Sequence, residues 1–394
     1  MVRTRARQSA YRRARTCIRV AVGSVVVLFL LGAGSALAPP TVNRPPVSYD
    51  GDVAIRFSGP RGARHVSYWC GLDRRHVRRC ASPYRARLAP GRHTFRVQAR
   101  DSAGRRSRFA RTTVVVAAPA PAVAVGSQPV TIAYGGGSLW TADYGAGTVT
   151  RVDPGARRRV ATILVDGQPG GIAASGTTVW VGNFGAGQGI TVIDVATNAV
   201  TGRITTGQEP VGLLLAGSSL WVADYAGWVD RLDARTGRLE ARVQVGGNPQ
   251  ALALGFGLLW AANFAGTVDA IDPASARLVA RIPAGNDIDG IAVSGDRVWA
   301  ADLTNRRLVV IDPSTRSVER RVSVGGAASG VTTRGASVWA SLYDRGLVVE
   351  VDGATGRIVQ RVRVGRQPRE FASTGADLWV VDQRSNSVSR VLPG

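Results

Sequence analysis

The chain has 394 residues, of which 50 are basic and 27 acidic, so its formal net charge is +23. An apolar content of 45% and 48 glycines exclude a wholly disordered or collagen-like chain. Three cysteines and three histidines exclude a disulfide-dense miniprotein, a multi-cysteine zinc array and most histidine-based metal sites.

The positive charge is distributed unevenly. Residues 1–19 hold seven arginines and no acid, and residues 39–117 hold 17 arginines and four aspartates. Residues 118–394 are nearly neutral, with 26 arginines and 23 acids. A charge of +23 suggests nucleic-acid binding. The first basic part is expected to direct export and the second to be exported with it, so we expect no nucleic-acid partner.

The first 38 residues are typical of a targeting segment. Seven arginines precede an uncharged apolar run over residues 20–38, a pattern that keeps the N-terminus in the cytoplasm and directs the remainder out of it. As a helix, this run would be roughly 28 Å long, enough to cross a bilayer. Ala36-Leu37-Ala38 resembles a signal-peptidase site, although Pro39 disfavours cleavage directly after Ala38. The sequence leaves open a cleaved signal peptide, giving a secreted protein, or a retained membrane anchor.

A proline-rich linker over residues 39–46 precedes a small β module at residues 47–117. Turn signals separate runs of alternating or β-branched residues, so this segment predicts a small β-sandwich. Strands are expected at residues 53–57, 65–70, 93–99 and 111–116. In an oxidising compartment, a disulfide between Cys70 and Cys80 would close a short loop and stabilise the module by about 2–4 kcal/mol.

This module resembles a recurrent bacterial Ig-like module. The resemblance rests on Trp69-Cys70-Gly71-Leu72-Asp73, on Cys80-Ala81-Ser82-Pro83 and on the pattern from His93 to Gly104. It implies a spacer or adhesive unit of an exported surface protein, without catalytic residues, in which His93 is structural. The run containing Arg74, Arg75, Arg78 and Arg79 suggests contact with anionic envelope polymers or lipid head groups; the alternative is a general bias toward arginine.

The remaining residues, 118–394, contain seven repeats. Tryptophan recurs at a spacing of about 40 residues, which is typical of propellers and solenoids, at Trp140, Trp180, Trp221, Trp260, Trp299, Trp339 and Trp379. Each unit predicts four short strands without helical periodicity, which favours an all-β seven-bladed propeller. The last repeat stops after its third strand, and residues 122–126 match the fourth strands elsewhere. We therefore expect this N-terminal strand to complete the last blade.

The repeats resemble YVTN-type β-propeller units and, more loosely, the propeller of streptogramin (virginiamycin) B lyase. The shared pattern is a Pro, an Ile-Ala pair, the Trp-Val-Ala-Asp run and a later Ile-Asp-Pro. The Trp residues are expected to pack between blades. Asp153, Asp272 and Asp312, each followed by proline, are expected to form turns between the third and fourth strands.

Two repeated positions begin the hairpin between the second and third strands. The first position is mainly Asp or Asn, and the next is mainly aromatic. The candidates for a ligand-binding face are Asp143, Tyr144, Asn183, Phe184, Asp224, Tyr225, Asn263, Phe264, Asp302, Tyr343 and Asp382. The polar side chains either cap their own turns or form a ring around the channel mouth. The aromatic side chains either pack between blades or stack on a ligand.

The fifth and sixth repeats depart from the pattern. Ile288 and Ala328 replace the recurring proline, and Leu342 replaces the polar hairpin residue. Broken repeat rules often mark functional sites, and clustered carboxylates suit a hard cation such as Ca²⁺. This predicts a calcium site formed by Asp287, Asp289, Asp302 and Asp344, with ordinary repeat drift as the alternative.

An enzyme is disfavoured. The lyase resemblance implies a histidine base and Mg²⁺, but residues 118–394 contain no histidine, no cysteine and no lysine-bearing phosphate loop. The preferred interpretation is an extracytoplasmic binding or scaffold protein that needs no cofactor. Its propeller would present a loop-rich face to a protein, peptide or glycan, with the basic module as a spacer.

Overall fold

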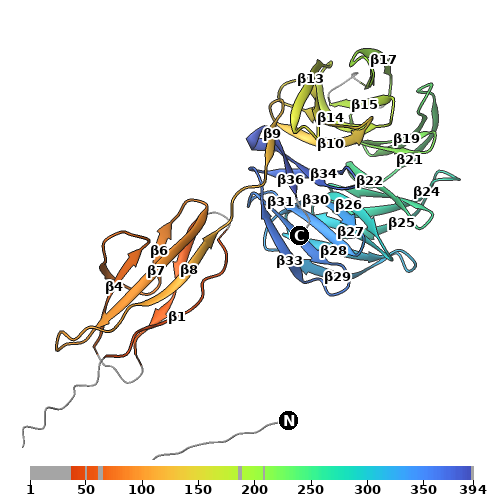
Figure 1. Cartoon of the computed structure of the whole chain (residues 1–394). Coiled ribbons are helices and arrows are strands. Elements are labelled where there is room, and N and C mark those ends of the chain that lie inside the picture. The colour runs from red at the N-terminus through yellow and green to blue at the C-terminus, as the bar shows by residue number, and fades with distance from the viewer. Residues whose placement is uncertain (1–36, 49–50, 61–64, 185–188, 207–208, 392–394) are drawn as a thin grey trace, which may run out of the picture.

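The computed structural model describes residues 37–48, 51–60, 65–184, 189–206 and 209–391. A small β module is followed by a larger ring of sheets (Figure 1). The predicted export segment over residues 1–38 lies almost wholly outside the described residues. Within the described part of the chain, no helix is both long and apolar enough to cross a membrane.

The N-terminal module contains one four-stranded sheet, in the order β5-β4-β7-β8, and the strand pairs β1–β3 and β2–β6. Its strands are β1 (Thr41–Val42), β2 (Asp52–Ile55), β3 (Phe57–Ser58), β4 (Ser67–Leu72), β5 (Arg78–Cys80), β6 (Tyr84–Arg87), β7 (Gly91–Arg100) and β8 (Ala110–Val116). Alternate residues of the strands, such as Ile55, Phe95 and Val114, are completely buried and form one core. The strand alternation visible in the sequence therefore produces the module's core.

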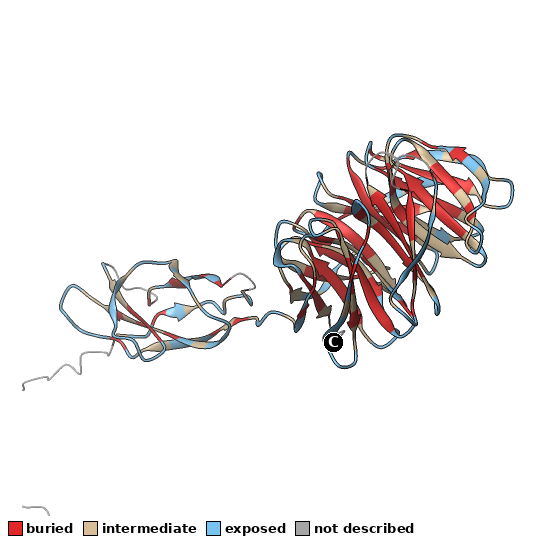
Figure 2. Cartoon of the chain, turned by 90° about the horizontal axis from the view of Figure 1, so that it is seen from above, coloured by how far each residue is buried: buried red, intermediate tan, exposed pale blue. Residues whose placement is uncertain are grey.

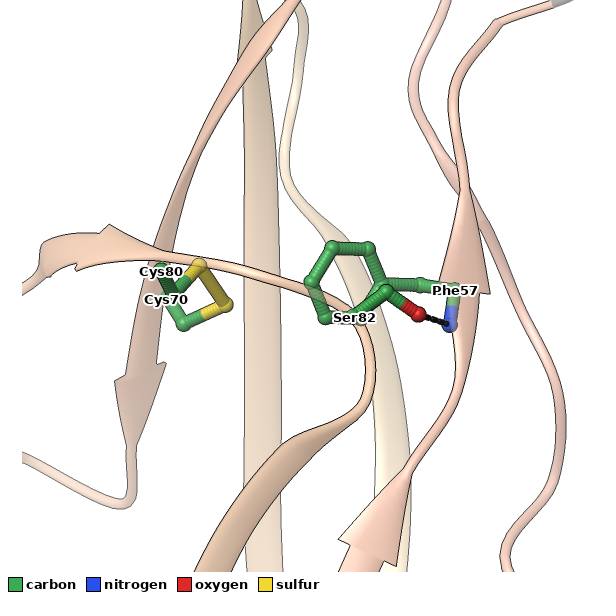
Figure 3. The surroundings of a disulfide bond; sticks show 4 residues. All are labelled: Phe57, Cys70, Cys80 and Ser82. Carbon is green, nitrogen blue, oxygen red and sulfur yellow. Dashed lines mark hydrogen bonds between the residues drawn. A yellow bond between two sulfur atoms is a disulfide. The ribbon is translucent and has the colours of Figure 1, made fainter.

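The predicted disulfide between Cys70 and Cys80 is present and joins β4 to β5 (Figure 3). The Cα atoms of the two residues are 5.8 Å apart. Nearby, the backbone N–H of Phe57 donates to Oγ of Ser82 over 2.9 Å, which ties β3 to the segment that follows the second cysteine. The disulfide and this hydrogen bond fix the irregular edge of a module too small to rely on its core alone.

The propeller part contains seven four-stranded antiparallel sheets among the described residues. We number the sheets one to seven in chain order. The first strands are β10 (Pro129–Gly135), β14 (Gln168–Ala174), β18 (Pro210–Ala216), β22 (Pro249–Gly255), β26 (Ile288–Ser294), β30 (Ala328–Arg334) and β34 (Pro368–Ser373). The second strands are β11 (Ser138–Asp143), β15 (Thr178–Phe184), β19 (Ser219–Asp224), β23 (Leu258–Asn263), β27 (Arg297–Asp302), β31 (Ser337–Leu342) and β35 (Leu378–Asp382).

The two outer strands of each sheet follow in the same order. The third strands are β12 (Thr148–Asp153), β16 (Ile190–Asp194), β20 (Trp228–Asp233), β24 (Thr267–Asp272), β28 (Arg307–Asp312), β32 (Leu347–Asp352) and β36 (Ser387–Val391). The fourth strands are β13 (Arg158–Leu164), β17 (Val200–Ile204), β21 (Leu239–Gln244), β25 (Arg277–Pro283), β29 (Ser317–Ser323), β33 (Ile358–Arg363) and β9 (Ala122–Ala124). A short 3-10 helix, η1 (Gln383–Ser385), lies in the last hairpin.

The first strands of neighbouring sheets contact one another in sequence, and β34 of the seventh sheet contacts β10 of the first. These strands therefore surround a central channel, which is the arrangement of a β-propeller. As the sequence predicts, β9 completes the seventh sheet, with Ala124 opposite Ser387 and Ala122 opposite Ser389. This pairing of the two ends of the domain covers an edge that would otherwise remain open.

The repeated tryptophans are buried between adjacent sheets. Trp299 shares a core cluster with Val338 and Ala340 of the next sheet, and Trp379 shares one with Ile132 and Leu139 of the first sheet. The second and third strands are mostly buried, whereas the fourth strands and the connecting loops are mostly exposed or half-buried (Figure 2). The 40-residue period thus specifies one large inter-sheet side chain per unit, as predicted.

The turns between the third and fourth strands also form as predicted. Oδ1 of Asp153 accepts the backbone N–H groups of Gly155 and Ala156, both over 2.9 Å. In the later repeats a Ser or Thr hydroxyl, together with backbone N–H groups, donates to the turn aspartate and lowers its pKa by stabilising the charged form, at Asp194, Asp233, Asp272, Asp312 and Asp352. These carboxylates are therefore turn residues.

Candidate functional site

Each first strand contains a β-bulge near its start. The register shifts there in all seven sheets, so that residues of the inner strand are left without a partner opposite. A bulge re-aims the side chain of the extra residue. The bulged positions are Val130, Gly170, Val211, Gln250, Asp289, Ser329 with Gly330, and Arg369 with Glu370.

Most of these bulged residues line one cavity of about 340 Å³ in the channel. Tyr144, which directly follows β11, and Phe184, the last residue of β15, also line it. Because the first strands start where the second strands end, the cavity lies at the end of the channel where these hairpins project. We call this end of the channel the mouth.

Four ionisable side chains gather at one side of the mouth. We call Asp287, Asp289, Arg369 and Glu370 the charged cluster. Both carboxylate oxygens of Asp289 accept from Nη2 of Arg369 over 3.2 Å, and Ser329 also donates its hydroxyl to Asp289. The Arg369 guanidinium lies 5.7 Å from the ring centroid of Tyr343, within range of a cation–π interaction. One half-buried arginine thus serves a group of three carboxylates.

Burial and neighbouring negative charge raise the pKa of two carboxyl groups in the cluster, those of Glu370 and Asp287. Burial and the charge of Asp289 raise the pKa of Glu370 to about 8, although Arg369 and the backbone N–H of Phe371 oppose the shift. Glu370 is half-buried and faces the cavity, so its charged form is less well solvated than in open water. Burial and Asp289 likewise raise the pKa of Asp287 to about 6.

Asp287 is the least satisfied member of the cluster. Only 9% of the residue is exposed, and its Oδ1 atom is buried without a hydrogen-bond partner among the described residues. It is electrostatically coupled to Asp289, Arg369 and Tyr225. A buried carboxylate oxygen without a donor is costly, so the mouth has an unmet requirement for a hydrogen-bond donor or a cation.

An aromatic row forms the opposite side of the mouth. Tyr144, Phe184, Tyr225 and Phe264 lie on four consecutive sheets, and their neighbouring ring centroids are 6.3, 6.3 and 6.4 Å apart. The rings therefore contact one another across the sheets, as the packing interpretation expects. Tyr144 and Phe184 also line the cavity, so the row remains accessible to a ligand.

The polar hairpin residues that precede the aromatic positions bond mainly within their own hairpins, and Asp224 also accepts the backbone N–H of Glu209. All six are buried: Asp143, Asn183, Asp224, Asn263, Asp302 and Asp382. Asp143 accepts the hydroxyls of Thr141, Thr148 and Thr150, and Asn183 donates to Oγ1 of Thr191 over 2.9 Å. These contacts correspond to the turn-stabilising alternative and not to a ring of ligand-facing side chains.

Asp382 is also one of these polar hairpin residues, but no basic side chain pairs with it among the described residues. Its Oδ2 accepts from the hydroxyls of Ser387 and Ser389 over 3.1 and 2.6 Å, whereas its Oδ1 has no partner among the described residues. Burial raises its pKa to about 7, more than the hydroxyl groups offset. Asp302, by contrast, accepts from Nε of Arg307 over 2.9 Å.

The predicted calcium ligands do not converge. Asp302 is engaged by Arg307, and Asp344 forms an ion pair with Arg306 over 2.7 Å. Asp289 is taken by Arg369. Within the described ranges, no group of three or more His, Cys, Asp or Glu side chains is placed to hold a metal ion. The prediction of a four-carboxylate calcium site is therefore not supported, because arginines occupy the positions that a cation would take.

Sequence reasoning found part of the mouth. It singled out the aromatic row, Tyr343, Asp287 and Asp289, but it missed the site roles of Arg369 and Glu370. The available signal was the pair of positions after the recurring proline. These positions hold small or apolar residues in the first repeats, such as Gly170 and Gly171, and become Arg369 and Glu370 in the last.

The comparisons with known proteins support the fold. No family model matches the chain, and no curated protein is similar to it in sequence. Among solved structures, Kuenenia stuttgartiensis hydrazine synthase is similar, with a TM-score of 0.61 and 17% identity. The match covers 68% of this chain and 96% of that chain. At this identity the likeness establishes the all-β propeller architecture and nothing about activity.

Proposed function

We propose that this chain is an extracytoplasmic binding protein whose propeller takes a ligand, or a protruding part of a protein, peptide or glycan partner, at the channel mouth. The observation that carries the proposal is the cavity of about 340 Å³ that is lined by the rings of Tyr144 and Phe184 and by Asp289, Arg369 and Glu370 of the charged cluster. A mainly apolar wall with a few converging polar groups is the usual form of a small-ligand site.

The bulges supply independent support. They place residues that differ from repeat to repeat in the channel, whereas the Trp residue recurs in all seven repeats and the turn aspartate in the first six. A ring that served only as a spacer would have no use for partly unsatisfied carboxylates such as Asp287. A bound ligand that donates hydrogen bonds to these carboxylates would offset the free energy lost by burying them unpaired.

Two glycines provide a matched test. A Cβ added at Gly170, at the cavity, meets no atom closer than 3.8 Å, and one added at Gly202, on the outer strand β17, meets none within 4 Å. Both positions therefore accept a side chain, but only Gly170→Phe fills the mouth. The full chain is screened by ligand-observed NMR against dipeptides, disaccharides and phenyl compounds.

Binding that Gly170→Phe abolishes and Gly202→Phe preserves would support the proposal. Absence of any binding to the full chain, or binding unaffected by Gly170→Phe, would contradict it. Incubation with a cyclic depsipeptide is the control for the lyase alternative, because ring opening would contradict a purely binding role.

We further propose that the seven sheets are the blades of a closed YVTN-type ring and that the N-terminal module is an Ig-like spacer. We also propose that residues 1–38 export the chain. Mass spectrometry of the native N-terminus, with cell fractionation, separates a cleaved signal from a retained anchor. Recovery of the intact chain from the cytoplasm would contradict export.

The basic module provides a second contact in this proposal. Arg74, Arg75, Arg78 and Arg79 are all exposed, which supports attraction to anionic envelope polymers or lipid head groups. Binding of the full chain to teichoic-acid-like polyphosphate should weaken as salt rises from 50 to about 500 mM. An affinity indifferent to salt would contradict the electrostatic contact.

A further inference from the structure

We propose that the group seated in the mouth is an organic cation, namely a primary ammonium or guanidinium attached to an apolar or aromatic moiety. This inference rests on the proposed binding function and specifies its ligand class. Three observations carry it: the excess of carboxylates over cations, the buried oxygen of Asp287 that has no donor among the described residues, and the two rings of the aromatic row that line the same cavity as Asp289 and Glu370.

The charge balance of the mouth favours a cation. Asp287, Asp289 and Glu370 share one guanidinium, and Arg369 directs its hydrogen bonds to Asp289 alone. The backbone N–H of Phe371 and the charge of Arg369 lower the pKa of Glu370 less than burial and Asp289 raise it. A bound ammonium would donate to Asp287 and Glu370, which satisfies both charge and hydrogen bonding. An anion would face the two carboxyls that Arg369 leaves uncompensated.

The aromatic row favours the same ligand class. The faces of Tyr and Phe rings carry negative potential and attract ammonium or guanidinium groups. The mouth already contains such a pair, because Arg369 lies over the ring of Tyr343. On the opposite side, Tyr144 and Phe184 offer ring surface in the cavity. An amine with an apolar tail would therefore place its charge among the carboxylates and its tail against these rings.

A metal ion fits the mouth less well. The carboxylates do not form a group of three ligands among the described residues, and Arg369 lies where the cation would have to approach Asp289. An organic cation needs no convergent coordination shell and can bridge carboxylates several ångströms apart through separate N–H donors. The geometry therefore points to hydrogen-bonding cations.

The test compares three probes of matched size on the full chain by titration calorimetry: phenethylammonium, phenethyl alcohol and 3-phenylpropanoate. A fourth probe, N-acetyl-lysine methylamide, distinguishes a peptide side chain from a free amine. We expect phenethylammonium to bind at least about tenfold more tightly than the alcohol, and the carboxylate to bind most weakly. Tighter binding of the blocked lysine than of phenethylammonium would assign the site to a peptide.

Two isosteric variants locate the effect. Glu370→Gln and Asp287→Asn should each weaken phenethylammonium by about five- to tenfold, because each removes a carboxylate that faces the ammonium. The control is Glu319→Gln, since Glu319 pairs with Arg297 on the outer part of the fifth sheet and should change the affinity less than about twofold.

The outcomes separate the two proposals. Equal affinity for amine and alcohol, lost in Gly170→Phe, would overturn the cation inference and leave the binding function standing. Unchanged amine affinity in both Glu370→Gln and Asp287→Asn would also overturn the inference. If none of the four probes binds and the wider screen is also negative, both proposals fail.

Discussion

The two halves of the channel mouth are built from one repeat but present opposite chemistry. The first four sheets place mainly apolar or small residues at the bulges and the aromatic row at the hairpins. The last three sheets place Asp289, Ser329, Arg369 and Glu370 at the bulges, and Leu303, Tyr343 and Gln383 at the hairpin positions. The difference teaches that the repeat maintains the ring through its buried residues, whereas the bulges and hairpins are free to vary and carry the site.

The comparison can be tested by moving residues from one half of the mouth into the other. The largest effect is expected when Arg369 is replaced by the residue of the fourth sheet, as Arg369→Gln, because Asp289 then loses its ion pair in a poorly solvated site. We expect a loss of about 3 kcal/mol of unfolding free energy at pH 8.

Equilibrium denaturation checks this, and the loss should be smaller at pH 5, where Asp287 and Glu370 are protonated. Arg277→Gln, at an exposed position of β25, is the control and should change stability by less than about 0.5 kcal/mol. An equal loss from Arg369→Gln at both pH values would contradict the electrostatic explanation.

The next effect concerns Asp382, where the second and fourth sheets carry Asn183 and Asn263. The raised pKa means that the folded state binds the proton more tightly, so the group's stabilisation is present below about pH 4 and is lost as pH rises to about 7. Asp382→Asn should therefore increase stability at pH 8, by about 2 kcal/mol, and change it little at pH 4.

Thermal or chemical denaturation across pH 4–8 measures this difference. Asp302→Asn is the matched control and should have the opposite sign at pH 8, because Arg307 would lose its carboxylate. Destabilisation by Asp382→Asn at pH 8 would contradict the prediction, because it would mean that the charged carboxylate stabilises the folded state.

The smallest effect is expected for Phe184→Leu, which places the leucine of the fifth sheet, Leu303, into the aromatic row. The ring of Phe184 contacts both Tyr144 and Tyr225, so its removal should cost about 1 kcal/mol. Tyr134→Leu, an exposed ring on β10, should cost less than about 0.5 kcal/mol. If denaturant unfolding shows the same loss of unfolding free energy for both variants, contacts within the aromatic row do not stabilise the fold.

The sequence predicted features that depend on local pattern or on the repeat itself. The Trp spacing, the aspartate turns and the pairing of β9 with β36 follow from comparing one unit with another. The convergence of Arg369 with Asp289 was not predictable in this way, because 80 residues separate them and a bulge in each strand brings them together. The calcium prediction was not supported for a similar reason, since it ignored Arg306 and Arg307.

Proton release tests the central claim of a cation-binding mouth most directly. Phenethylammonium is titrated into the full chain at pH 7 in two buffers with different ionisation enthalpies. Glu370, with a pKa of about 8, holds a proton at pH 7, and a bound cation favours its charged form. We therefore expect close to one proton to be released per ligand bound to the native chain, and almost none in Glu370→Gln. Binding without proton release, or equal release in the variant, would contradict the account.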